Sequence, residues 1–431
     1  MGEIIDQIEY NPFAMLTRIF RQSAIPPEYH SNFLHLYLDI AWYGLLSGSA
    51  INFLNIYATR IGATGFQIGL IGAMSAVVTL FLAIPSGRWL QRQNTGKAIF
   101  WSSVLYRIGF VALIFLPMLS DKVGQIWAII AITFLMAIPL TPLGVGFNAL
   151  FADAVPVEYR AHVAAIRNVM LSITYMLASL VSGYILENVT FPLGYQIVFG
   201  IGAVGAAMSS FHLYFIRPLQ TAAPSLQPKP APDPVILRPY ARNLSTTLRL
   251  DVWNTRFRNV LFALFAFHLT QFLAIPIFPL YNVHVLNLSD DHIGIGTALF
   301  YLTVLLGSTQ LRKVAHNIGN KKLTGWSVSA MALYPLLLAF STRVWHYYGL
   351  SLIGGLTFSM VSGAYANYML EYIPAHDRPP HLAWYNVILN AAILIGSLAG
   401  PVIADAIGLS GALLLIAALR FVAGLSISRW G

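Results

Sequence analysis

The sequence predicts an all-α polytopic membrane protein whose twelve transmembrane helices form two pseudo-symmetric bundles of six. First, the 431 residues are 57% hydrophobic and 10% charged, whereas a soluble domain carries about 25% charged residues. Second, apolar runs long enough to cross a bilayer recur along the whole chain. Third, a proline-rich stretch separates these runs into two equal sets, and short motifs recur in both sets.

Each span is predicted from an apolar run of about 20 residues, the length that crosses a hydrocarbon core of about 30 Å. The first bundle is expected at residues 32–217 and the second at residues 257–431. In the first bundle the runs are 33–58, 66–90, 98–117, 125–150, 163–187 and 193–216. In the second bundle they are 257–283, 293–311, 323–341, 346–371, 382–407 and 409–428.

Two segments lie outside the predicted bundles. Residues 1–31 carry scattered acidic and apolar residues, unlike a signal peptide, which has a positive start and an apolar core. They are expected on the cytoplasmic side, either as a short interfacial helix or without regular structure. Residues 218–256 are a predicted cytoplasmic linker. Seven prolines between residues 218 and 239 exclude a helix there, and an amphipathic surface helix is expected after them.

The distribution of basic residues predicts the orientation in the membrane. Of the 25 Lys and Arg residues, 21 fall in or near the termini and the even-numbered connections, whereas Arg60, Lys122 and Arg343 lie on the other side. By the positive-inside rule, both termini are expected in the cytoplasm, and the chain is expected in the plasma membrane. The inner membrane surface accounts for the net charge of +9, so no nucleic-acid partner is expected.

The residue types that usually carry catalysis or metal binding are scarce or scattered. There is no cysteine, which excludes disulfides, thiolate metal sites, iron–sulfur clusters and cysteine nucleophiles. The 11 histidines show neither H-E-x-x-H nor paired ligand spacing. We therefore predict no enzyme activity, no cofactor and no metal site.

One motif occurs once in each predicted bundle. It reads Pro-x-x-x-Arg, with an asparagine eight residues after the arginine. The first copy supplies Arg160 and Asn168, and the second supplies Arg378 and Asn386, at an offset of 218 residues. Such a match at corresponding places indicates an internal repeat of six spans.

With these features the chain resembles the major facilitator superfamily over nearly its whole length. The loop after the second span keeps the family's leading glycine, Gly87, and an arginine, Arg92, although a glutamine replaces the usual acid. Residues 396–401 read Gly-x-x-x-Gly-Pro, which is similar to the family's packing element in the eleventh span. The resemblance implies two bundles that rock about a site near the midplane. It also makes Gly87 and Arg92 candidates for a cytoplasmic gate.

Three titratable or charged residues within spans are candidates for ion coupling, because a charge at membrane depth costs at least about 2.5–3.5 kcal/mol. Asp39 and Arg107 are predicted at similar depths in the first and third spans. Either Asp39 carries a proton and Arg107 tunes its pKa, or the two form an ion pair that only holds the first bundle together. His268 in the seventh span is either a relay or substrate contact, or is only hydrogen-bonded to another helix.

Five polar residues within spans are candidates to line the substrate path: Asn52, Asn55, Asn148, Gln271 and Asn390. Asn52 lies thirteen residues after Asp39, which places the two side chains roughly 140° apart around the helix. They are therefore not expected to face the same cavity. Asn148 follows Pro139 and Pro142, which either interrupt the fourth span beside a cavity or introduce a kink that only shapes packing.

Polar residues near the cytoplasmic ends of spans five and eleven are candidates for the inner gate: Arg160, Arg167, Asn168, Arg378 and Asn386. In the family that the chain resembles, these two helices line the central path. Arg167 has the alternative of extending its charge to the membrane interface, and Arg420 in the last span is expected to do so.

We therefore expect a secondary active transporter that moves a small neutral or amphipathic solute by alternating access, with proton-coupled efflux as one form. The few charges within the spans argue against a highly charged substrate. The alternative is a lipid or lysophospholipid flippase of the same fold. The expected partners are a small-molecule substrate, membrane lipid and protons, and the transporter is expected to be a monomer.

Overall fold

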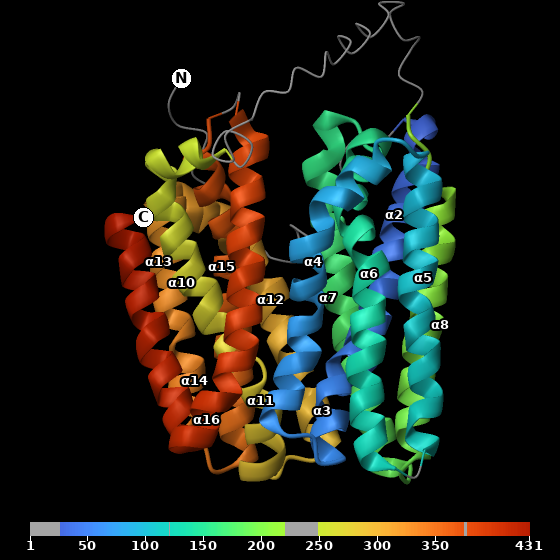
Figure 1. The fold of residues 1–431 in the computed structure, drawn as a ribbon, viewed down its shortest axis with the longest axis vertical. Helices are drawn as coiled ribbons and strands as arrows, with labels where there is room; N and C mark the ends of the chain where they lie inside the picture. The colour runs from blue at the N-terminus through green and yellow to red at the C-terminus, as the bar shows by residue number, and fades with distance from the viewer. Residues whose placement is uncertain (1–25, 120, 220–248, 375–376) are drawn as a thin grey trace, which may run out of the picture.

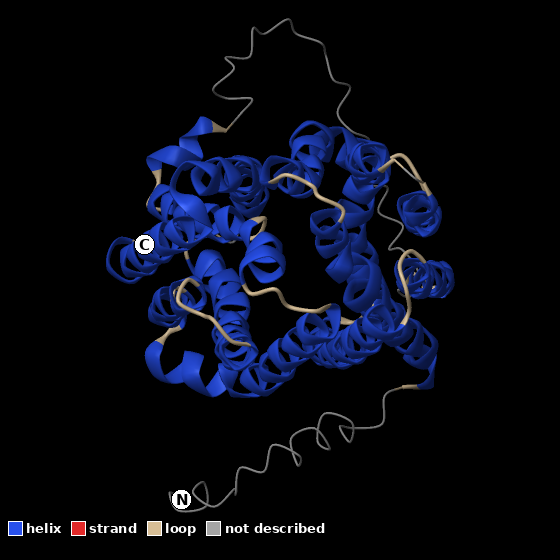
Figure 2. Cartoon of the chain, turned by 90° about the horizontal axis from the view of Figure 1, so that it is seen from below, coloured by secondary structure: helices blue, strands red, loops and turns tan. Residues whose placement is uncertain are grey.

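The computed structural model describes residues 26–119, 121–219, 249–374 and 377–431. Within these ranges the chain consists of helices joined by short loops, with no strand (Figure 2). The expectation for residues 1–25 and that for most of the proline-rich linker lie outside the described residues. The predicted all-α fold class is confirmed.

The first half of the molecule contains six spans. The first span is built from α2 (Pro27–Leu46), the π-helical turn η1 (Ser47–Ile51) and α3 (Asn52–Arg60). The other five spans are α4 (Gly65–Leu90), α5 (Thr95–Phe115) with η2 (Leu116–Met118), α6 (Lys122–Ala154), α7 (Val157–Asn188) and α8 (Leu193–Phe215).

The second half begins with the 3₁₀ turn η3 (Leu250–Asn254). Its first span is built from α10 (Phe257–Ala274), α11 (Ile277–Leu280) and the π-helical turn η4 (Tyr281–Val285). The following helices are α12 (Asp290–Ile318), α13 (Asn320–Met331), α14 (Leu333–Leu338), α15 (Val344–Glu371) and α16 (Arg378–Trp430). Within α16 the backbone leaves the helical conformation at Gly408, with φ 81° and ψ 158°.

Twelve spans follow from these helices. Nine helical segments of the described chain are long and apolar enough to cross a membrane, and one of them, Phe257–Val285, joins α10, α11 and η4. The first and ninth spans are not among these nine. α16 counts once but holds the last two spans, on either side of Gly408. The span order predicted from the apolar runs is therefore confirmed.

One of the two alternatives for the fourth span is not observed: Pro139 and Pro142 do not interrupt it, because α6 runs as one helix from Lys122 to Ala154. The amphipathic helix expected before the seventh span lies mostly outside the described residues, and its described end is the 3₁₀ turn η3. Its N-cap residue Arg249 has a φ of 51°, a left-handed conformation that a continuing α-helix cannot contain.

A second repeated element marks the start of a helix in each half. Thr64 caps α4 through a capping box, in which its hydroxyl accepts from the backbone N–H of Gln67 and the Gln67 side chain accepts from the backbone N–H of Thr64. In the second half, Ser289 precedes α12 and His292 stands at the position of Gln67. Ser289 makes no side-chain cap hydrogen bond to α12, so the two halves share the position of this element but not its capping box.

The two halves lie side by side and meet along two helix pairs, α4 with α16 and α7 with α12 (Figure 1). We call the end of the molecule that carries Leu219 and Arg249 the linker face, which is at the top of Figure 1. The other end, which carries the loops after α3 and α7, is the opposite face. Chain segments from both halves reach each face, as expected for membrane-spanning bundles.

Candidate functional site

A cavity of about 620 Å³ lies between the two halves, toward the linker face. It is bounded by α4 and α6 from the first half and by α16 from the second. Its polar lining consists of hydroxyl and amide side chains, and none of its described lining residues is charged. These polar residues are Thr79, Thr141, Asn148, Asn386 and Asn390.

The amides of α16 have a fixed orientation in this cavity. Asn386 donates its side-chain N–H to the carbonyl of Leu382 at 3.0 Å, and Asn390 donates to the carbonyl of Asn386 at 2.8 Å. Because one N–H of each amide is bound to the helix backbone, the side-chain oxygen and the second N–H remain for other partners. This cavity is therefore lined by three residues predicted from the sequence. Asn148 and Asn390 were predicted for the substrate path, and Asn386 was predicted for the gate.

The other path candidates lie deeper, on the first spans of the two halves. Asn52 and Asn55 are on α3, Gln271 is on α10, and α3 contacts both α11 and η4. Each of these three side chains has one buried polar atom without a hydrogen-bond partner in the described chain, and so does Asn282 on η4. An unmet buried group costs about 1–3 kcal/mol. These amides are thus available to water or to a solute.

Asp39 lies in a buried network of the first half and is 3% exposed. Its carboxylate accepts from Arg167 Nη1 at 3.3 Å and from the hydroxyl of Ser209, and it lies 3.9 Å from Arg107 Nη2. Arg107 also donates to Ser210 at 2.8 Å. Two guanidinium groups share one carboxylate, so the network carries one positive charge in excess.

This network contains a residue that was expected elsewhere. Arg107 is close to Asp39, as its depth suggested, but Arg167 is closer. Arg167 is only 9% exposed, donates to the carbonyl of Leu36 at 2.8 Å and lies over the ring of Phe147. It therefore does not extend to the membrane interface.

In the second half, His268 and Arg420 are buried at 7% and 2% exposure. His268 Nε2 lies 3.1 Å from the hydroxyl of Tyr385. Arg420 donates to the carbonyls of Thr270 at 2.8 Å and Met331 at 3.5 Å. The expectation that Arg420 extends to the interface was wrong, because backbone carbonyls inside the bundle satisfy part of its guanidinium.

Of the remaining gate candidates, Asn168 follows Arg167 within α7, and the others lie at or near helix ends toward the linker face. A Cβ built on Gly87 would meet nothing within 4 Å, and Arg92, Asn168 and Arg378 are exposed. Arg160 donates to the carbonyls of Ala152 at 2.7 Å and Val155 at 3.1 Å, so it caps the end of α6. The repeat partners Arg160 and Arg378 therefore have different surroundings.

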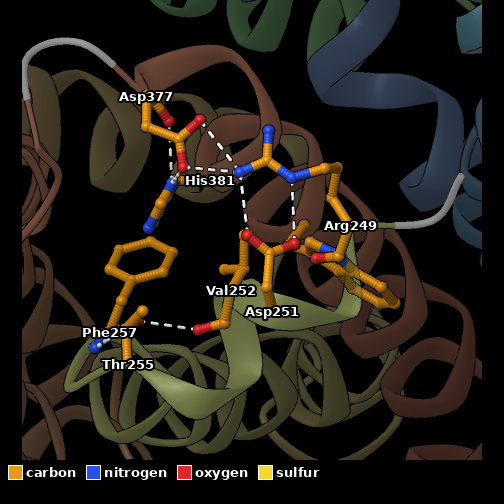
Figure 3. Close-up of polar contacts among 8 residues, drawn as sticks. Arg249, Asp251, Val252, Thr255, Phe257, Asp377 and His381 are labelled. Atoms are coloured by element: carbon orange, nitrogen blue, oxygen red, sulfur yellow. Dashed lines mark hydrogen bonds and ion pairs between the residues drawn. The ribbon is translucent and has the colours of Figure 1, made fainter. Parts of the chain in front are cut away.

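A cluster at the linker face holds the chain after the linker against the second half (Figure 3). Arg249 donates to Asp251 at 2.9 Å and to Asp377 at 2.8 Å, and the ring of His381 lies 3.4 Å from the Asp377 carboxylate. The hydrogen bonds from Arg249 lower the pKa of the Asp251 carboxyl. Trp384 completes the cluster by donating to the carbonyl of Arg249 at 3.2 Å.

The two halves are tightly packed toward the opposite face. A Cβ on Gly69 of α4 would lie 2.1 Å from the carbonyl oxygen of Ser397 on α16. Gly183 of α7 faces Gly294 of α12, and a Cβ on either glycine would be too close to the backbone of the other helix. Ser179 donates to the Gly294 carbonyl at 3.0 Å. Only residues without a side chain allow such close backbone approach. The central cavity is thus closed toward this face.

Sequence reasoning missed the polar cluster that joins the halves at the opposite face. Arg60, at the end of α3, forms an ion pair with Asp290, at the start of α12, with a distance of 2.9 Å. Tyr195 of α8 donates to the other carboxylate oxygen at 3.0 Å. Only one feature of the sequence pointed to this cluster: Arg60 is among the few basic residues predicted on the side away from the linker.

Comparison with known proteins identifies the family. The model described as Major Facilitator Superfamily matches residues 40–267 and 260–430. The staphyloferrin B transporter of Staphylococcus aureus is 28% identical over 183 residues, 40% of this chain and 42% of that protein. The class H tetracycline resistance protein of Pasteurella multocida is 27% identical over 119 residues, 28% of this chain and 30% of that protein. The matches thus span less than half the length of these curated relatives.

Solved structures are similar in fold over almost the whole chain. The nucleoside transporter NupG has a TM-score of 0.64 at 14% identity, covering 92% of this chain and 98% of that one. A bacterial homologue of the human lysosomal transporter Spinster, in an inward-facing and unoccupied conformation, has a TM-score of 0.65 at 13% identity, covering 94% and 99%. With a family model that matches both halves, the chain belongs to the Major Facilitator Superfamily.

Proposed function

We propose that this transporter moves a small, uncharged solute rich in hydrogen-bonding groups by alternating access between its two halves. The observation that carries the proposal is the cavity between α4, α6 and α16, whose polar lining is uncharged. A charged substrate would need a compensating charge in such a site, because an unpaired buried charge is costly. The unmet amides of Asn52, Asn55 and Gln271 offer further uncharged contacts deeper in the molecule.

We also propose that the linker face is cytoplasmic and that the membrane is the plasma membrane. The basic residues gathered at this side support the orientation. The cavity then opens toward the cytoplasm and the opposite face is closed, as in the inward-facing state that describes the similar Spinster homologue. The opposite face is accordingly called the outer face below.

Efflux is the direction that we propose, with protons as the coupling ion. A relative named for tetracycline resistance supports export of an amphipathic solute, although it matches only 28% of this chain. Asp39, Arg107 and His268 stay as candidates for coupling. All three have their side-chain partners, among the described residues, inside their own half, which equally suits a structural role.

The test uses the purified transporter in lipid nanodiscs and a thermal-shift panel of uncharged nucleosides, sugars, tetracycline and small carboxylic acids. We expect an uncharged or amphipathic compound to raise the melting temperature. Replacing both Asn386 and Asn390 by Ala should weaken its binding about thirtyfold, since each of the two hydrogen bonds contributes about 1 kcal/mol.

Asn367→Ala is the matched control, because Asn367 on α15 makes the same amide-to-backbone bond, to Gly363, but does not line the cavity. Binding should be unchanged in that variant. If only carboxylic acids stabilise the protein, or if the double variant binds as well as the control, the proposed substrate class is wrong.

Lipid flipping is the alternative function. It is favoured by the position of the cavity, which lies where α4 of the first half meets α16 of the second. Two of its apolar lining residues, Ile84 and Val387, are 67% and 43% exposed, so the cavity has a side that faces lipid. In vesicles without added solute, a flippase would move fluorescently labelled phospholipid or lysophospholipid between leaflets. A solute transporter would leave the leaflet distribution unchanged.

A further inference from the structure

A groove of about 430 Å³ lies on the surface of the first half, between α5 and α8. These two helices pack side by side at the edge of the molecule that is remote from the second half (Figure 1). The groove runs along α5 from Phe100 to Val111 and along α8 from Ala203 to Tyr214. Its rim is apolar and exposed, so within the membrane it opens to lipid, and it is separate from the cavity between the halves.

The floor of this groove holds a buried cation. Arg107 lines the groove beside Ser210, and the two residues are 6% and 5% exposed. Arg107 Nη1 donates to the hydroxyls of Ser103 and Ser210, at 2.5 and 2.8 Å. Arg107 Nε is buried and has no hydrogen-bond partner among the described residues. The guanidinium therefore retains an unmet donor at the groove.

The unmet donor belongs to the edge with which an arginine binds a carboxylate. At the outer face, Arg60 donates to Asp290 through Nε at 3.0 Å and through Nη2 at 2.9 Å. Arg107 makes no such contact with Asp39, because the distance from Nη2 to the carboxylate is 3.9 Å. The Nε–Nη2 edge of Arg107 can thus take a second carboxylate, and such paired contacts are the strong ones.

The charge of the surrounding network favours an anion in this place. Asp39 is shared by Arg107 and Arg167, which leaves one positive charge without a counter-ion at a depth where charge is costly. An added carboxylate makes the network neutral. Asp39 repels that carboxylate, but it keeps Arg167 at 3.3 Å and the hydroxyl of Ser209 as its own partners.

The depth of Arg107 limits what the anion can be. Arg107 lies twelve residues after Thr95, the first residue of α5, so it is about 18 Å along the axis from the linker-face end of that helix. This position is near the middle of a hydrocarbon core of about 30 Å, whereas phospholipid headgroups lie in the polar region outside the core. A carboxylate is a small headgroup that still presents two acceptor oxygens to a guanidinium.

The walls of the groove indicate the apolar part of the ligand. On the linker side of Arg107 the groove is bounded by aromatic rings, and Phe100 and Tyr214 pack edge to face at 5.1 Å. On the outer side its α8 wall consists of Ala203 and Ala207, which leave room for an alkyl chain. The volume lies within the range of roughly 300–1,000 Å³ that small-molecule sites occupy.

We propose that the groove between α5 and α8 binds a free fatty acid from the membrane, with its carboxylate on Arg107 and its chain along Ala203 and Ala207. The ligand neutralises the surplus charge beside Asp39 and thereby stabilises the first half. Every residue of the site belongs to that half, so its occupancy depends neither on rotation of the halves nor on the transported solute.

The test uses a fatty acid that carries a photoreactive diazirine on its chain. The purified transporter is placed in nanodiscs of phosphatidylcholine, so that the probe is the one anionic amphiphile present. After illumination, we expect mass spectrometry to locate the label on the groove-lining residues of α5 and α8. Excess dodecanoate should abolish this labelling, whereas dodecanol and methyl dodecanoate, which lack the carboxylate, should leave most of it.

Arg107→Met tests the contribution of the cation. Labelling should fall at least about tenfold, because the charge-assisted pair is lost. The variant should fold, since Asp39 keeps Arg167 as its counter-ion. Arg420→Met is the matched control, because Arg420 is a buried arginine of the second half that does not line the groove. It should leave the labelling of α5 and α8 unchanged.

Ala207→Phe tests the chain site without changing a charge. The larger side chain fills the groove beside Arg107, so labelling should fall to background. Ala112→Phe is the matched control, because Ala112 is an exposed residue of α5 that does not line the groove. It should be labelled as the unmodified protein is. This second pair of variants keeps the test decisive if Arg107→Met does not fold.

If dodecanol competes as well as dodecanoate, the groove accepts any alkyl chain and the proposed anion site is wrong. The proposal is also overturned if Arg107→Met or Ala207→Phe is labelled as strongly as its control. Label spread evenly over the lipid-facing helices would exclude a defined site. No solute is transported in this experiment, so failure of the thermal-shift panel would count against the proposed substrate and not against the fatty-acid site.

Discussion

Asp39 and Asp290 are both buried carboxylates paired with arginine, but they differ in where their partners lie. Asp39 is bound by side chains from α5, α7 and α8, all in its own half. Asp290 is bound by α3 and α8 across the boundary between the halves. Under the proposed rotation of two rigid bundles, the arrangement around Asp39 stabilises a bundle, whereas the arrangement around Asp290 stabilises one conformation. The location of its partners therefore indicates what a buried charge contributes.

The largest effect should come from Asp39→Asn. It leaves Arg107 and Arg167 buried without their shared counter-ion, and removing one partner of a buried pair costs about 3–5 kcal/mol. Thermal unfolding in detergent, followed by Trp fluorescence, should show this loss beside an unchanged Asp405→Asn control, since Asp405 is an exposed acid in α16. Normal stability combined with loss of gradient-driven transport would instead place Asp39 among the coupling residues.

Gly69→Ala should act between the halves. Its Cβ would lie 2.1 Å from the backbone carbonyl oxygen of Ser397, so closure of the outer face costs about 1–3 kcal/mol of overpacking. We expect a longer distance between spin labels on cysteines introduced at Thr190 and Thr342, two exposed loop positions at the outer face. We also expect slower transport. Gly200→Ala, where a Cβ meets nothing within 4 Å, should change neither. An unaltered distance in Gly69→Ala would show that α4 and α16 do not limit closure.

Arg420→Met should have a small effect although the residue is as deeply buried as Asp39. Arg420 is bonded by backbone carbonyls in the described chain, and an apolar side chain of similar length removes a desolvated cation without stranding a carboxylate. We expect the unfolding free energy to change by less than about 1 kcal/mol. A loss as large as that of Asp39→Asn would mean that Arg420 has a stronger partner than these carbonyls.

The smallest effect should come from the exposed cluster of Arg249 and Asp251. Arg249 lowers the pKa of Asp251, so the stabilisation is present above the ordinary carboxyl pKa and is lost as pH falls through the lowered value. Arg249→Ala should therefore flatten the acid side of the stability profile slightly. The profile is measured as melting temperature between pH 3 and 7. The variant should melt slightly lower than the unmodified protein near neutral pH and at the same temperature at the acid end. An equal shift at both ends would contradict this assignment.

The span order and the internal repeat could be predicted from the sequence because they depend on local properties. Apolar length defines a span, and the capping pair of Thr64 and Gln67 defines where α4 begins. The π-helical turns η1 and η4, and the division between α13 and α14, left no such signal. They depend on how a helix packs against its neighbours.

The site could be predicted only in part, for the same reason. Asn148, Asn386 and Asn390 were singled out as polar residues in apolar spans, and they do line one cavity. Arg60 and Asp290 are 230 residues apart in the chain, so their contact requires the three-dimensional arrangement of both halves. Arg420 was expected at the interface, and Arg167 there or at the inner gate, because interior carboxylate and carbonyl partners cannot be predicted from spacing alone.

The reversal at Gly408 has a mechanical consequence. The chain turns between the last two spans through a single residue with a positive φ, which glycine adopts without steric cost. Such a short connection leaves the two arms of α16 almost no freedom to move independently. Any tilt of the arm that carries Asn386 and Asn390 is therefore transmitted to the arm that carries Arg420. The last two spans therefore move together, which couples the α16 wall of the cavity between the halves to the interior of the second half.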